Sequence, residues 1–488
     1  MARTELPIAT GFYEDASRPI ASQTCINYIP QIPQTNALSR AQLIGTPGIT
    51  LRSTAGTKSA RGAHVMNGLP YTVNGTILYR ENDDATTTSL GTITGTGRVS
   101  MADNGTQICI VVPGSTGYIY TVAGGLVTIS DAEFTTNIGP SEQVVFKDGY
   151  FIHYNNASAS GTGVVFFISN LNDGTAYDAL DFGSAEEDPD RITGIHVNRG
   201  TLYIGGEQTR EMEDNIGVVS GNFPFQKVKS GTDTKGVKAQ FSLIDFDNGF
   251  AFVGGGLNEQ PAVWIGSGNV SRKISTSAID NVLRQATDAQ LEAIFCTTYA
   301  EGGGYFLNVH LTDSCFTYDS LASSLAQKPM WHERRSKDSF GRDTTWRVNN
   351  IIDAYGKTIV TDNQSGNIGD LESDVYTEYG TDITAVVSSA PFSNGGDPVE
   401  FPAMELTCES GVGNIVAPGD DPVVTREISV DGGQTFGNGT SRSLGKIGEY
   451  KKRQIWRREG QAQRFWVYRF SMAGPFKKVI IKLEVGEP

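Results

Sequence analysis

Histidines and carboxylates are the residues from which a hydrolase or a metal site would be built, and here the histidines are scattered. The five histidines form no HxxxH or HExxH pattern; they are His64, His153, His196, His310 and His332. A zinc protease needs two histidines four residues apart on one helix. Glu333 follows His332, but no second histidine stands where that motif needs it. We therefore expect no metal and no cofactor.

Motifs for nucleophilic catalysis and phosphate binding are also missing. The chain has no G-x-S-x-G elbow and no Walker A loop. Lys446 follows a glycine-rich turn, but Ile447 stands where a P-loop needs Ser or Thr. Gly95-Thr96-Gly97 lacks the third glycine of a dinucleotide fingerprint. We expect no catalytic residue, so the protein is predicted not to be an enzyme.

Acidic residues gather in three places. These are Asp83-Asp84, Glu186-Glu187-Asp188-Pro189-Asp190 and Asp420-Asp421. Glycosidases place two carboxylates a set distance apart across the scissile bond. Each of these clusters stands in a Gly- or Pro-rich stretch, which favours solvated loops. The alternative, a carbohydrate-binding or carbohydrate-degrading propeller such as a lectin or depolymerase, stays open.

A basic stretch near the end of the sequence is the strongest candidate for a partner interface. Its cations are Lys451, Lys452, Arg453, Arg457 and Arg458. Aromatic residues alternate with these cations, as in proteins that bind single-stranded nucleic acid. On a strand, however, Arg453 and Arg457 would share one face with Ile455, while Trp456 would point the other way. We therefore predict an edge or interface strand that docks on an acidic partner.

Charge is distributed unevenly along the 488 residues, whose net charge is −15. Residues 445–488 hold 11 basic and 4 acidic side chains, a local charge of +7. The remaining residues hold 28 basic and 50 acidic side chains, a local charge of −22. An acidic body repels the phosphate backbone, which argues against a protein that reads DNA sequence.

The composition and the placement of glycine turns favour an all-β chain. Gly makes up 57 of the 488 residues, and charged residues make up only 19%. A turn ending in glycine repeatedly precedes an alternating apolar strand; the glycines are Gly75, Gly105, Gly149, Gly200, Gly249, Gly304 and Gly356. A unit of this kind that recurs at roughly 40–50 residues is typical of propeller blades. We predict six or seven blades, and seven unrelated hairpins in a large sandwich are the alternative.

Three regions follow from these patterns. Residues 1–50 are proline-rich and predict an extended N-terminal arm; residues 51–374 predict the β-propeller; residues 375–488 alternate over longer strands and predict a β-sandwich or barrel. Residues 275–284 and a capping box at Thr287 and Gln290 predict a helical insert. Residues 429–436 match the Asp-box hairpin motif, S-x-D-x-G-x-T-F.

Nothing in the sequence predicts a membrane anchor or a disulfide. No stretch approaches 18 consecutive apolar residues, and the first residues carry no signal-peptide core. The five cysteines include no CxxC pair; they are Cys25, Cys109, Cys296, Cys315 and Cys408. An odd number of scattered cysteines favours reduced, buried thiols in a protein made in a cytosol.

Four segments resemble one known family. They are Gly95–Ala102 (GTGRVSMA), Asp190–Ile195 (DRITGI) with the following YIGG strand, Trp264–Gly268 (WIGSG) leading into residues 277–279, and Lys452–Gly460 (KRQIWRREG). In order and spacing they resemble the packaged-DNA stabilisation proteins of short-tailed bacteriophages (podoviruses), also called the tail hub or nozzle. The resemblance spreads over nearly the whole chain.

The resemblance implies a structural role in the virion tail. Members of that family have a propeller body, and six copies form a ring beneath the portal and its head-to-tail adaptor. The ring continues the DNA channel, holds packaged DNA until genome ejection, and carries the tail needle and the tailspikes. Double-stranded DNA would pass through without sequence-specific binding. A cellular scaffold propeller is a further alternative.

Overall fold

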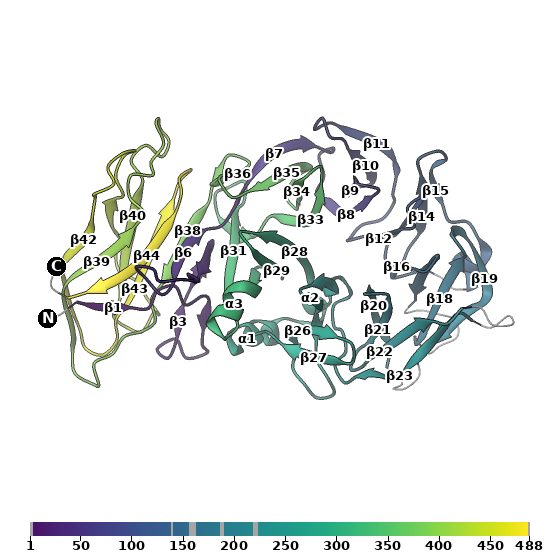
Figure 1. Ribbon diagram of the computed structural model, residues 1–488, viewed down its shortest axis with the longest axis horizontal. Coiled ribbons are helices and arrows are strands. Elements are labelled where there is room, and N and C mark those ends of the chain that lie inside the picture. Colours follow the sequence, from purple (N-terminus) through teal and green to yellow (C-terminus); the bar gives the residue numbers. More distant parts are fainter. Residues whose placement is uncertain (1–2, 138–139, 156–162, 186–189, 218–222, 487–488) are drawn as a thin grey trace.

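A computed structural model describes residues 3–137, 140–155, 163–185, 190–217 and 223–486 of the protein. Strands dominate it, as the sequence predicts. Viewed down its shortest axis, the molecule has a round propeller on one side and a separate stack of strands on the other (Figure 1). The fold is therefore a β-propeller joined to a β-sandwich.

Six blades are built from consecutive strands in the described residues. Blade one contains β8 (Ala60–Met66), β9 (Leu69–Asn74), β10 (Ile77–Glu81) and β11 (Thr87–Thr92). Blade two contains β12 (Ser100–Asp103), β13 (Gln107–Val111), β14 (Gly117–Thr121) and β15 (Gly125–Thr128). Blade three contains β16 (Gln143–Lys147), β17 (Tyr150–Tyr154), β18 (Val165–Asn170) and β19 (Asp173–Ser184). Blade four contains β20 (Ile192–Asn198), β21 (Thr201–Gly206), β22 (Arg210–Asn215) and β23 (Phe225–Asp233). Blade five contains β24 (Ile244–Phe246), β25 (Gly249–Gly254), β26 (Ala262–Ser267) and β27 (Val270–Lys273). Blade six contains β28 (Phe295–Glu301), β29 (Gly304–His310), β30 (Cys315–Asp319) and β31 (Trp331–Lys337), with β32 (Asp343–Thr345) paired to β31.

The seventh blade closes the ring with a strand from the other end of the propeller sequence. It contains β33 (Val348–Ala354), β34 (Lys357–Asp362) and β35 (Asn367–Glu372), and its outer strand is β7 (Gly48–Thr54). The short strands β36 (Thr377–Glu378) and β37 (Thr381–Asp382) extend this sheet. Hydrogen bonds between β7 and β35 therefore fasten the beginning of the propeller to its end.

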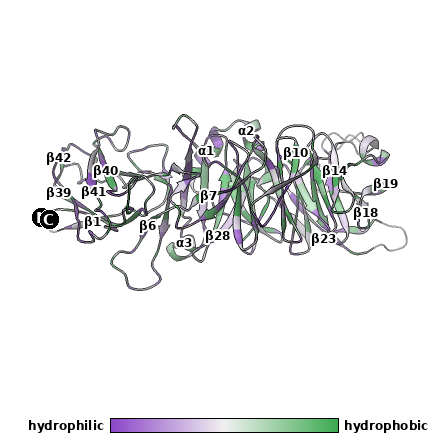
Figure 2. Cartoon of the chain, turned by 90° about the horizontal axis from the view of Figure 1, so that it is seen from above, coloured by the Kyte–Doolittle hydropathy of each residue, from purple (hydrophilic) through white to green (hydrophobic). Residues whose placement is uncertain are grey.

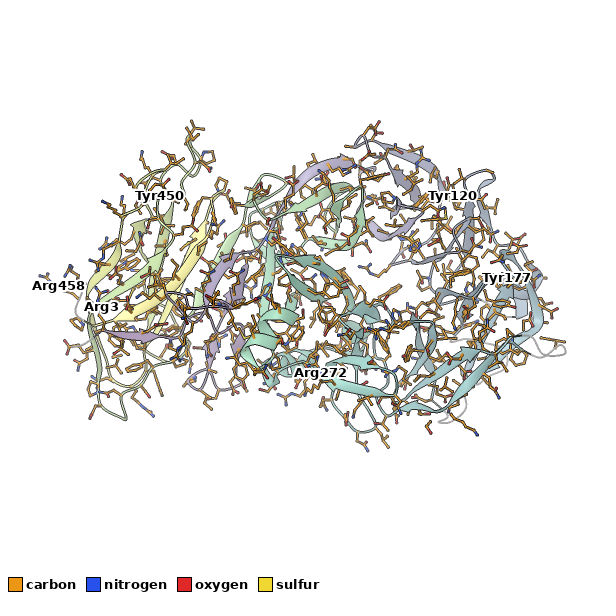
Figure 3. All side chains as sticks on the ribbon, in the orientation of Figure 1. Arg3, Tyr120, Tyr177, Arg272, Tyr450 and Arg458 are labelled. Carbon is orange, nitrogen blue, oxygen red and sulfur yellow. The ribbon has the colours of Figure 1, made fainter. Side chains whose placement is uncertain are left out.

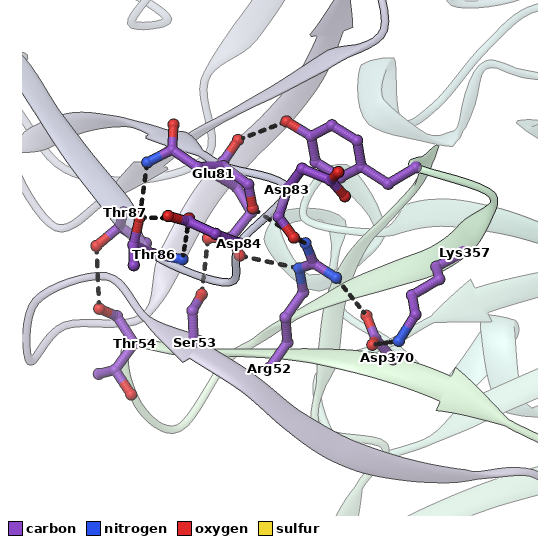
Figure 4. Close-up of polar contacts among 12 residues, drawn as sticks. Arg52, Ser53, Thr54, Glu81, Asp83, Asp84, Thr86, Thr87, Lys357 and Asp370 are labelled. Carbon is purple, nitrogen blue, oxygen red and sulfur yellow. Dashed lines mark hydrogen bonds and ion pairs between the residues drawn. The ribbon is translucent and has the colours of Figure 1, made fainter.

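An ion-pair network reinforces this closure (Figure 4). The Arg52 side chain on β7 donates to Glu81 of blade one at 3.0 Å and lies 3.7 Å from Asp370 of blade seven. The Ser53 hydroxyl donates to the second Glu81 oxygen at 2.7 Å. Burial raises the pKa of the Glu81 carboxyl group. Lys357 pairs with Asp370 on the other side.

Neighbouring blades share their hydrophobic cores. In β13, Ile108 and Ile110 pack with blade one, whereas Cys109 and Val111 pack with blade three. Successive residues of a strand point to opposite faces of its sheet. Because both faces of blade two are covered, β13 is apolar from Ile108 to Val111. Green stretches of strand also run through the propeller in Figure 2.

The Arg98 side chain connects the inner strands of several blades. Its guanidinium donates to the Asn350 side chain at 2.6 Å and to the Asn349 carbonyl at 2.6 Å. It also stacks on Phe295 of blade six, with 3.7 Å between the guanidinium carbon and the ring centroid. Asn349 in turn donates to the Ala60 carbonyl of blade one. This residue, just before β12, thus links blades one, two, six and seven.

The sandwich contains two sheets. One has the order β42 (Gln454–Ala462), β39 (Val399–Cys408), β44 (Val479–Val485), β6 (Gln42–Gly45) and β5 (Tyr28–Gln31), with β1 (Thr4–Leu6) also paired to β44. The other has the order β4 (Cys25–Ile26), β38 (Thr384–Ser388), β43 (Val467–Ala473), β40 (Val423–Ser429) and β41 (Thr440–Ser443). The N-terminal segment thus supplies strands to both sheets.

Strand β4 also connects the two parts of the molecule. It pairs with β31 of blade six on one side and with β38 of the sandwich on the other. A separate small ribbon, β2 (Tyr13–Glu14) with β3 (Ser22–Gln23), precedes it. One hydrophobic core runs from blades five and six into the sandwich and includes Trp331, Tyr28 and Leu406.

Helices are few among the described residues. They are α1 (Ser277–Gln285), α2 (Asp288–Glu292) and α3 (Ser320–Ala326), with a π-helical turn at Glu133–Asn137 and a 3-10 turn at Gln240–Ser242. The capping box predicted at Thr287 and Gln290 is present at the start of α2. Helix α1 buries Ile279 and Leu283 against the core between blade five and the sandwich.

Candidate partner interface

The basic stretch begins just before β42, the outer strand of one sandwich sheet, and continues on it. Arg457 and Arg458 lie on the strand, and Lys451, Lys452 and Arg453 precede it. Trp456 is buried, while Arg453 and Arg457 are exposed on the opposite face. This is the alternation that the sequence predicts for a strand with one face on the core. The Trp456 ring nitrogen donates to the Thr440 carbonyl at 3.2 Å, which fixes the indole across the sandwich.

Two of the five predicted interface cations already have partners within the chain. Arg453 donates two hydrogen bonds, of 2.7 and 2.6 Å, to the Glu405 carboxylate on β39. Arg3 lies 2.9 Å from the same carboxylate. The Arg453 hydrogen bond lowers the pKa of Glu405. Lys452 pairs with Glu449 at 3.4 Å. These two cations are partly neutralised before any partner arrives.

The other three cations are exposed and make no ion pair with any described residue: Lys451, Arg457 and Arg458. Arg458 has a φ of +61°. It lies at a bulge, where the register between β42 and β39 shifts opposite Phe401 and Ala403. Pro402 lies between them and has no N–H group to donate to the neighbouring strand. The bulge leaves Pro402 out of the pairing, and β39 and β42 pair on either side of it.

The bulge also buries the acid next to Arg458. The Glu459 side chain is fully buried and pairs with Arg426 at 3.1 Å. Burial raises the pKa of Glu459. The acidic residue of the stretch thus points into the sandwich, and the arginines before it remain at the surface. Sequence alternation alone does not predict this, because the bulge breaks the two-residue period.

Four of the described carboxylates in the acidic clusters have hydrogen-bond or ion-pair partners within the chain. Asp84 accepts from the Thr86 amide at 3.1 Å, Asp421 accepts from the Ser443 hydroxyl, and Asp420 pairs with Lys446 at 3.5 Å. Asp190 accepts from the amides of three consecutive residues, Glu207, Gln208 and Thr209. Residues 186–189 lie outside the described residues.

Each of the five histidines is either buried or paired with an aspartate. His153, His310 and His332 are buried, and burial lowers the pKa of His153 and of His332 to about 3. His64 pairs with Asp103 at 2.7 Å, and His196 pairs with Asp245 at 2.9 Å. Each of these pairs joins the inner strands of two adjacent blades. Within the described part of the chain, no three His, Cys, Asp or Glu side chains are grouped to hold a metal ion.

The predicted Asp-box is a self-bonded loop between β40 and β41. The Asp431 carboxylate accepts from the Gln434 amide at 2.9 Å and from the Thr435 amide at 3.0 Å. Desolvation alone would raise the pKa of Asp431, but the hydrogen bonds from Ser429 and Thr435 outweigh it and lower the pKa to about 2. Arg469 stacks on Phe436 at 3.8 Å. This arrangement stabilises the loop without offering a free carboxylate.

The thiols agree with the expectation of reduced cysteines. All five are free and buried. No helix in the described ranges is long and apolar enough to cross a membrane.

Family profiles match both parts of the chain. One, described as "Bacteriophage P22 Gp10, beta-propeller", matches residues 4–376. A second, described as "Bacteriophage P22 Gp10, beta-sandwich", matches residues 386–486. The chain belongs to the bacteriophage P22 Gp10 family. The resemblance read from the sequence is therefore confirmed, and this family member is a structural protein of the phage tail.

Other comparisons add little for this family member. No curated protein sequence matched it. Among solved structures, the N-terminal domain of Nup159 is similar at 10% identity, covering 72% of this chain and 99% of that one, with a TM-score of 0.39. An exo-β-1,3-galactanase from Phanerochaete chrysosporium is similar at 10% identity, covering 81% and 96%, with a TM-score of 0.29. Similarity at this level supports no inference about function.

Proposed function

We propose that this protein is the tail hub, or nozzle, of a short-tailed phage. Six copies form a ring that docks beneath the portal adaptor, extends the DNA channel, retains the packaged genome and carries the tail needle and tailspikes. The observation that carries the proposal is the match of the propeller and the sandwich, in this order, to one phage tail family. The role is mechanical, with no enzymatic step and no cofactor, and its location is the virion tail.

Charge supports this role. Outside its last 44 residues, which carry +7, the chain carries −22. A wall that DNA must slide past has to avoid strong contacts with phosphate, because each such contact adds to the affinity for DNA. Double-stranded DNA would therefore pass the acidic body without sequence-specific binding.

The exposed cations on β42 and in the residues just before it support docking on acidic partners. Lys451, Arg457 and Arg458 are exposed and unpaired among the described residues, whereas Lys452 and Arg453 have acidic partners within the chain. Cations of this kind raise the rate of association more than the final affinity. The first three therefore contribute most to docking.

The test mixes the purified protein with portal–adaptor rings of the same phage and measures the mass of the product. We expect six added copies per ring and a narrowing extension by electron microscopy. Replacing all five basic residues with Ser slows docking and makes it less dependent on salt. The variant with Ser only at 451, 457 and 458 reproduces most of this loss, and the matched variant with Ser only at 452 and 453 docks nearly as fast as wild type.

Two outcomes would contradict the proposal. One is absence of binding to portal–adaptor rings at low salt by the folded wild-type protein. The other is release of oligosaccharides from host surface polysaccharide, which would favour the carbohydrate-active alternative. Equal docking rates for the two charge variants would overturn only the role assigned to the unpaired cations.

A further inference from the structure

One end of the sandwich carries apolar side chains that nothing in the described chain covers. Ile415 is 83% exposed, Val416 71%, Ile447 55% and Tyr450 73%. They lie on two loops, residues 411–422 and 444–453, which we call the sandwich tip. Four large apolar side chains on neighbouring loops are more than the isolated exposed residues of an ordinary surface.

The sandwich tip is held in shape by hydrogen bonds. The Gly411 amide donates to the Leu444 carbonyl at 3.1 Å, and the Ser410 hydroxyl donates to the Lys452 carbonyl at 2.9 Å. The Asn414 side chain donates to the carbonyls of Pro418 at 2.8 Å and Pro475 at 3.1 Å. These bonds fix both loops to the sandwich before a partner binds. Lys451 is part of the tip, and Arg457 and Arg458 follow on β42.

A second exposed apolar surface lies on the outer strand of blade three, β19. Leu180 is 80% exposed, Phe182 49%, and Leu171 in the preceding turn 61%. Four residues of β19, Asp178–Asp181, stand opposite the single residue Ile168 between two paired positions. The bulge carries Leu180 outward between Asp178 and Asp181. We call this surface the β19 ridge.

The two surfaces lie at opposite ends of the molecule. Figure 3 places Tyr450 and Arg458 at one end of the longest axis and Tyr177 of β19 at the other. The ridge is acidic: Asp178 and Asp181 make no ion pair with described residues. Desolvation and the charge of Asp178 raise the pKa of Asp181. An approaching cation would relieve this repulsion. The end with the sandwich tip has unpaired cations instead.

We propose that copies of this chain join head to tail, with the sandwich tip of one copy seated on the β19 ridge of the next. Apolar side chains then meet apolar side chains, and Lys451, Arg457 and Arg458 face Asp178 and Asp181. The slower docking expected without these three cations then follows from slower joining of copies on the adaptor. A contact between two different surfaces of the same chain leaves one surface free on each end, so it repeats until a ring closes. The inference rests on the proposed ring-forming function and assigns the surfaces that build the ring.

Disulfide cross-linking tests the contact directly. The native cysteines are all buried, so an introduced surface cysteine reacts alone. We expect Tyr450→Cys and Leu180→Cys proteins to form a disulfide-linked heterodimer when mixed under ring-forming conditions. Neither variant alone forms linked dimers through these surfaces. The matched control is Val270→Cys, which is 64% exposed on blade five. Tyr450→Cys should cross-link to Leu180→Cys at least about tenfold faster than to the control.

Charge exchange provides the second test. Asp178→Lys with Asp181→Lys should prevent ring assembly, and so should Lys451→Glu with Arg457→Glu and Arg458→Glu, because like charges across an interface cost several kcal/mol. A mixture of the two variants restores attraction at both contacts, since the native tip of the first meets the native ridge of the second and the reversed tip of the second meets the reversed ridge of the first. Mixed rings with alternating variants should therefore form and be detected by native mass spectrometry. Rings that form equally well with either reversal, or cross-links equal to the Val270→Cys control, overturn the proposal. Rings that dock on the adaptor without this cross-link leave the proposed function standing and reject these surfaces.

Discussion

The side chain of Asn27 joins the propeller to the sandwich: its amide donates to the Thr384 carbonyl of β38 at 2.8 Å. The same amide donates to the Arg335 carbonyl of blade six at 2.9 Å, and its oxygen accepts from the Arg335 amide at 3.0 Å. With a φ of +54°, Asn27 is in the left-handed region, which Asn tolerates better than most residues. Asn27 thus bridges the propeller and the sandwich through residues 308 and 357 positions away from it in the sequence.

Asn27→Ala removes these three bonds and leaves a strained backbone. We expect a loss of about 2–4 kcal/mol in the free energy of unfolding, since each buried hydrogen bond contributes about 1 kcal/mol and its partners become unsatisfied. Proteolysis between the two parts should also accelerate. Asn36→Ala, at an exposed position without a described hydrogen bond, is the control and should unfold like wild type.

Arg52→Met should weaken the closure of the propeller. It leaves the buried carboxylate of Glu81 without its cation, and breaking a buried ion pair from one side costs about 3–5 kcal/mol. Adding Glu81→Gln removes the stranded charge and should recover part of the loss. Calorimetry on both variants measures this. Lys58→Met, exposed on the loop after β7, should change the melting temperature little; an additive double variant would argue against the coupling.

Arg98→Ala should destabilise the inner ends of the blades. The guanidinium makes hydrogen bonds of 2.6 Å to Asn350 and 2.6 Å to the Asn349 carbonyl, and it stacks on Phe295. Lysine has no planar fork, so Arg98→Lys should restore less than half of the stability. We expect a loss of about 2–4 kcal/mol for the alanine variant in urea unfolding. The exposed Arg272→Ala is the control.

Acid should destabilise the protein through its buried histidines. Desolvation, with a contribution from Arg334, lowers the pKa of His332 from 6.5 to about 3 in the folded state. The unfolded chain therefore binds a proton that the folded chain does not, and stability falls as the pH drops below about 6.5. At pH 5 this amounts to about 2 kcal/mol for one such group.

His332→Leu isolates that contribution. Neither ring nitrogen of His332 has a described hydrogen-bond partner, so the substitution breaks no such bond. The melting temperature of the variant should fall less than that of wild type between pH 7 and pH 5. Val270→Ala, a change at an exposed residue without a titratable group, should leave the pH profile as it is in wild type. If the melting temperatures of wild type and His332→Leu fell in parallel with pH, His332 would not contribute to the loss of stability in acid.

Local structure was largely readable from the sequence. The glycine turns at 105, 149, 200, 249, 304 and 356 each precede the second strand of a blade. Gly75 instead precedes the third strand of blade one, and Gly68 before β9 occupies the equivalent place. The capping box at Thr287 and the alternation in the sandwich strands were also predictable. These signals depend on residues within a few positions of one another, where backbone preferences act directly.

The arrangement of the candidate interface was only half predictable. Alternation placed Trp456 inward and Arg457 outward, as observed. It did not predict that Arg453 is held by Glu405, 48 residues away in the sequence, or that a bulge opposite Pro402 buries Glu459 and leaves Arg458 at the surface. Which cations remain free depends on the register between two strands, and the core packing of both strands sets that register.

The sequence by itself determined that the chain is an all-β propeller followed by a sandwich, because strand period, turn chemistry and repeat length are local properties. Tertiary structure alone decided that β7 completes the seventh blade, that β4 joins blade six to the sandwich, and that the sandwich tip and the β19 ridge lie at opposite ends. The pairings of β7 and β4 join residues separated by some 300 positions, such as Ile49 with Leu371. Such pairings are selected by burial of a shared core, which no short stretch of sequence contains.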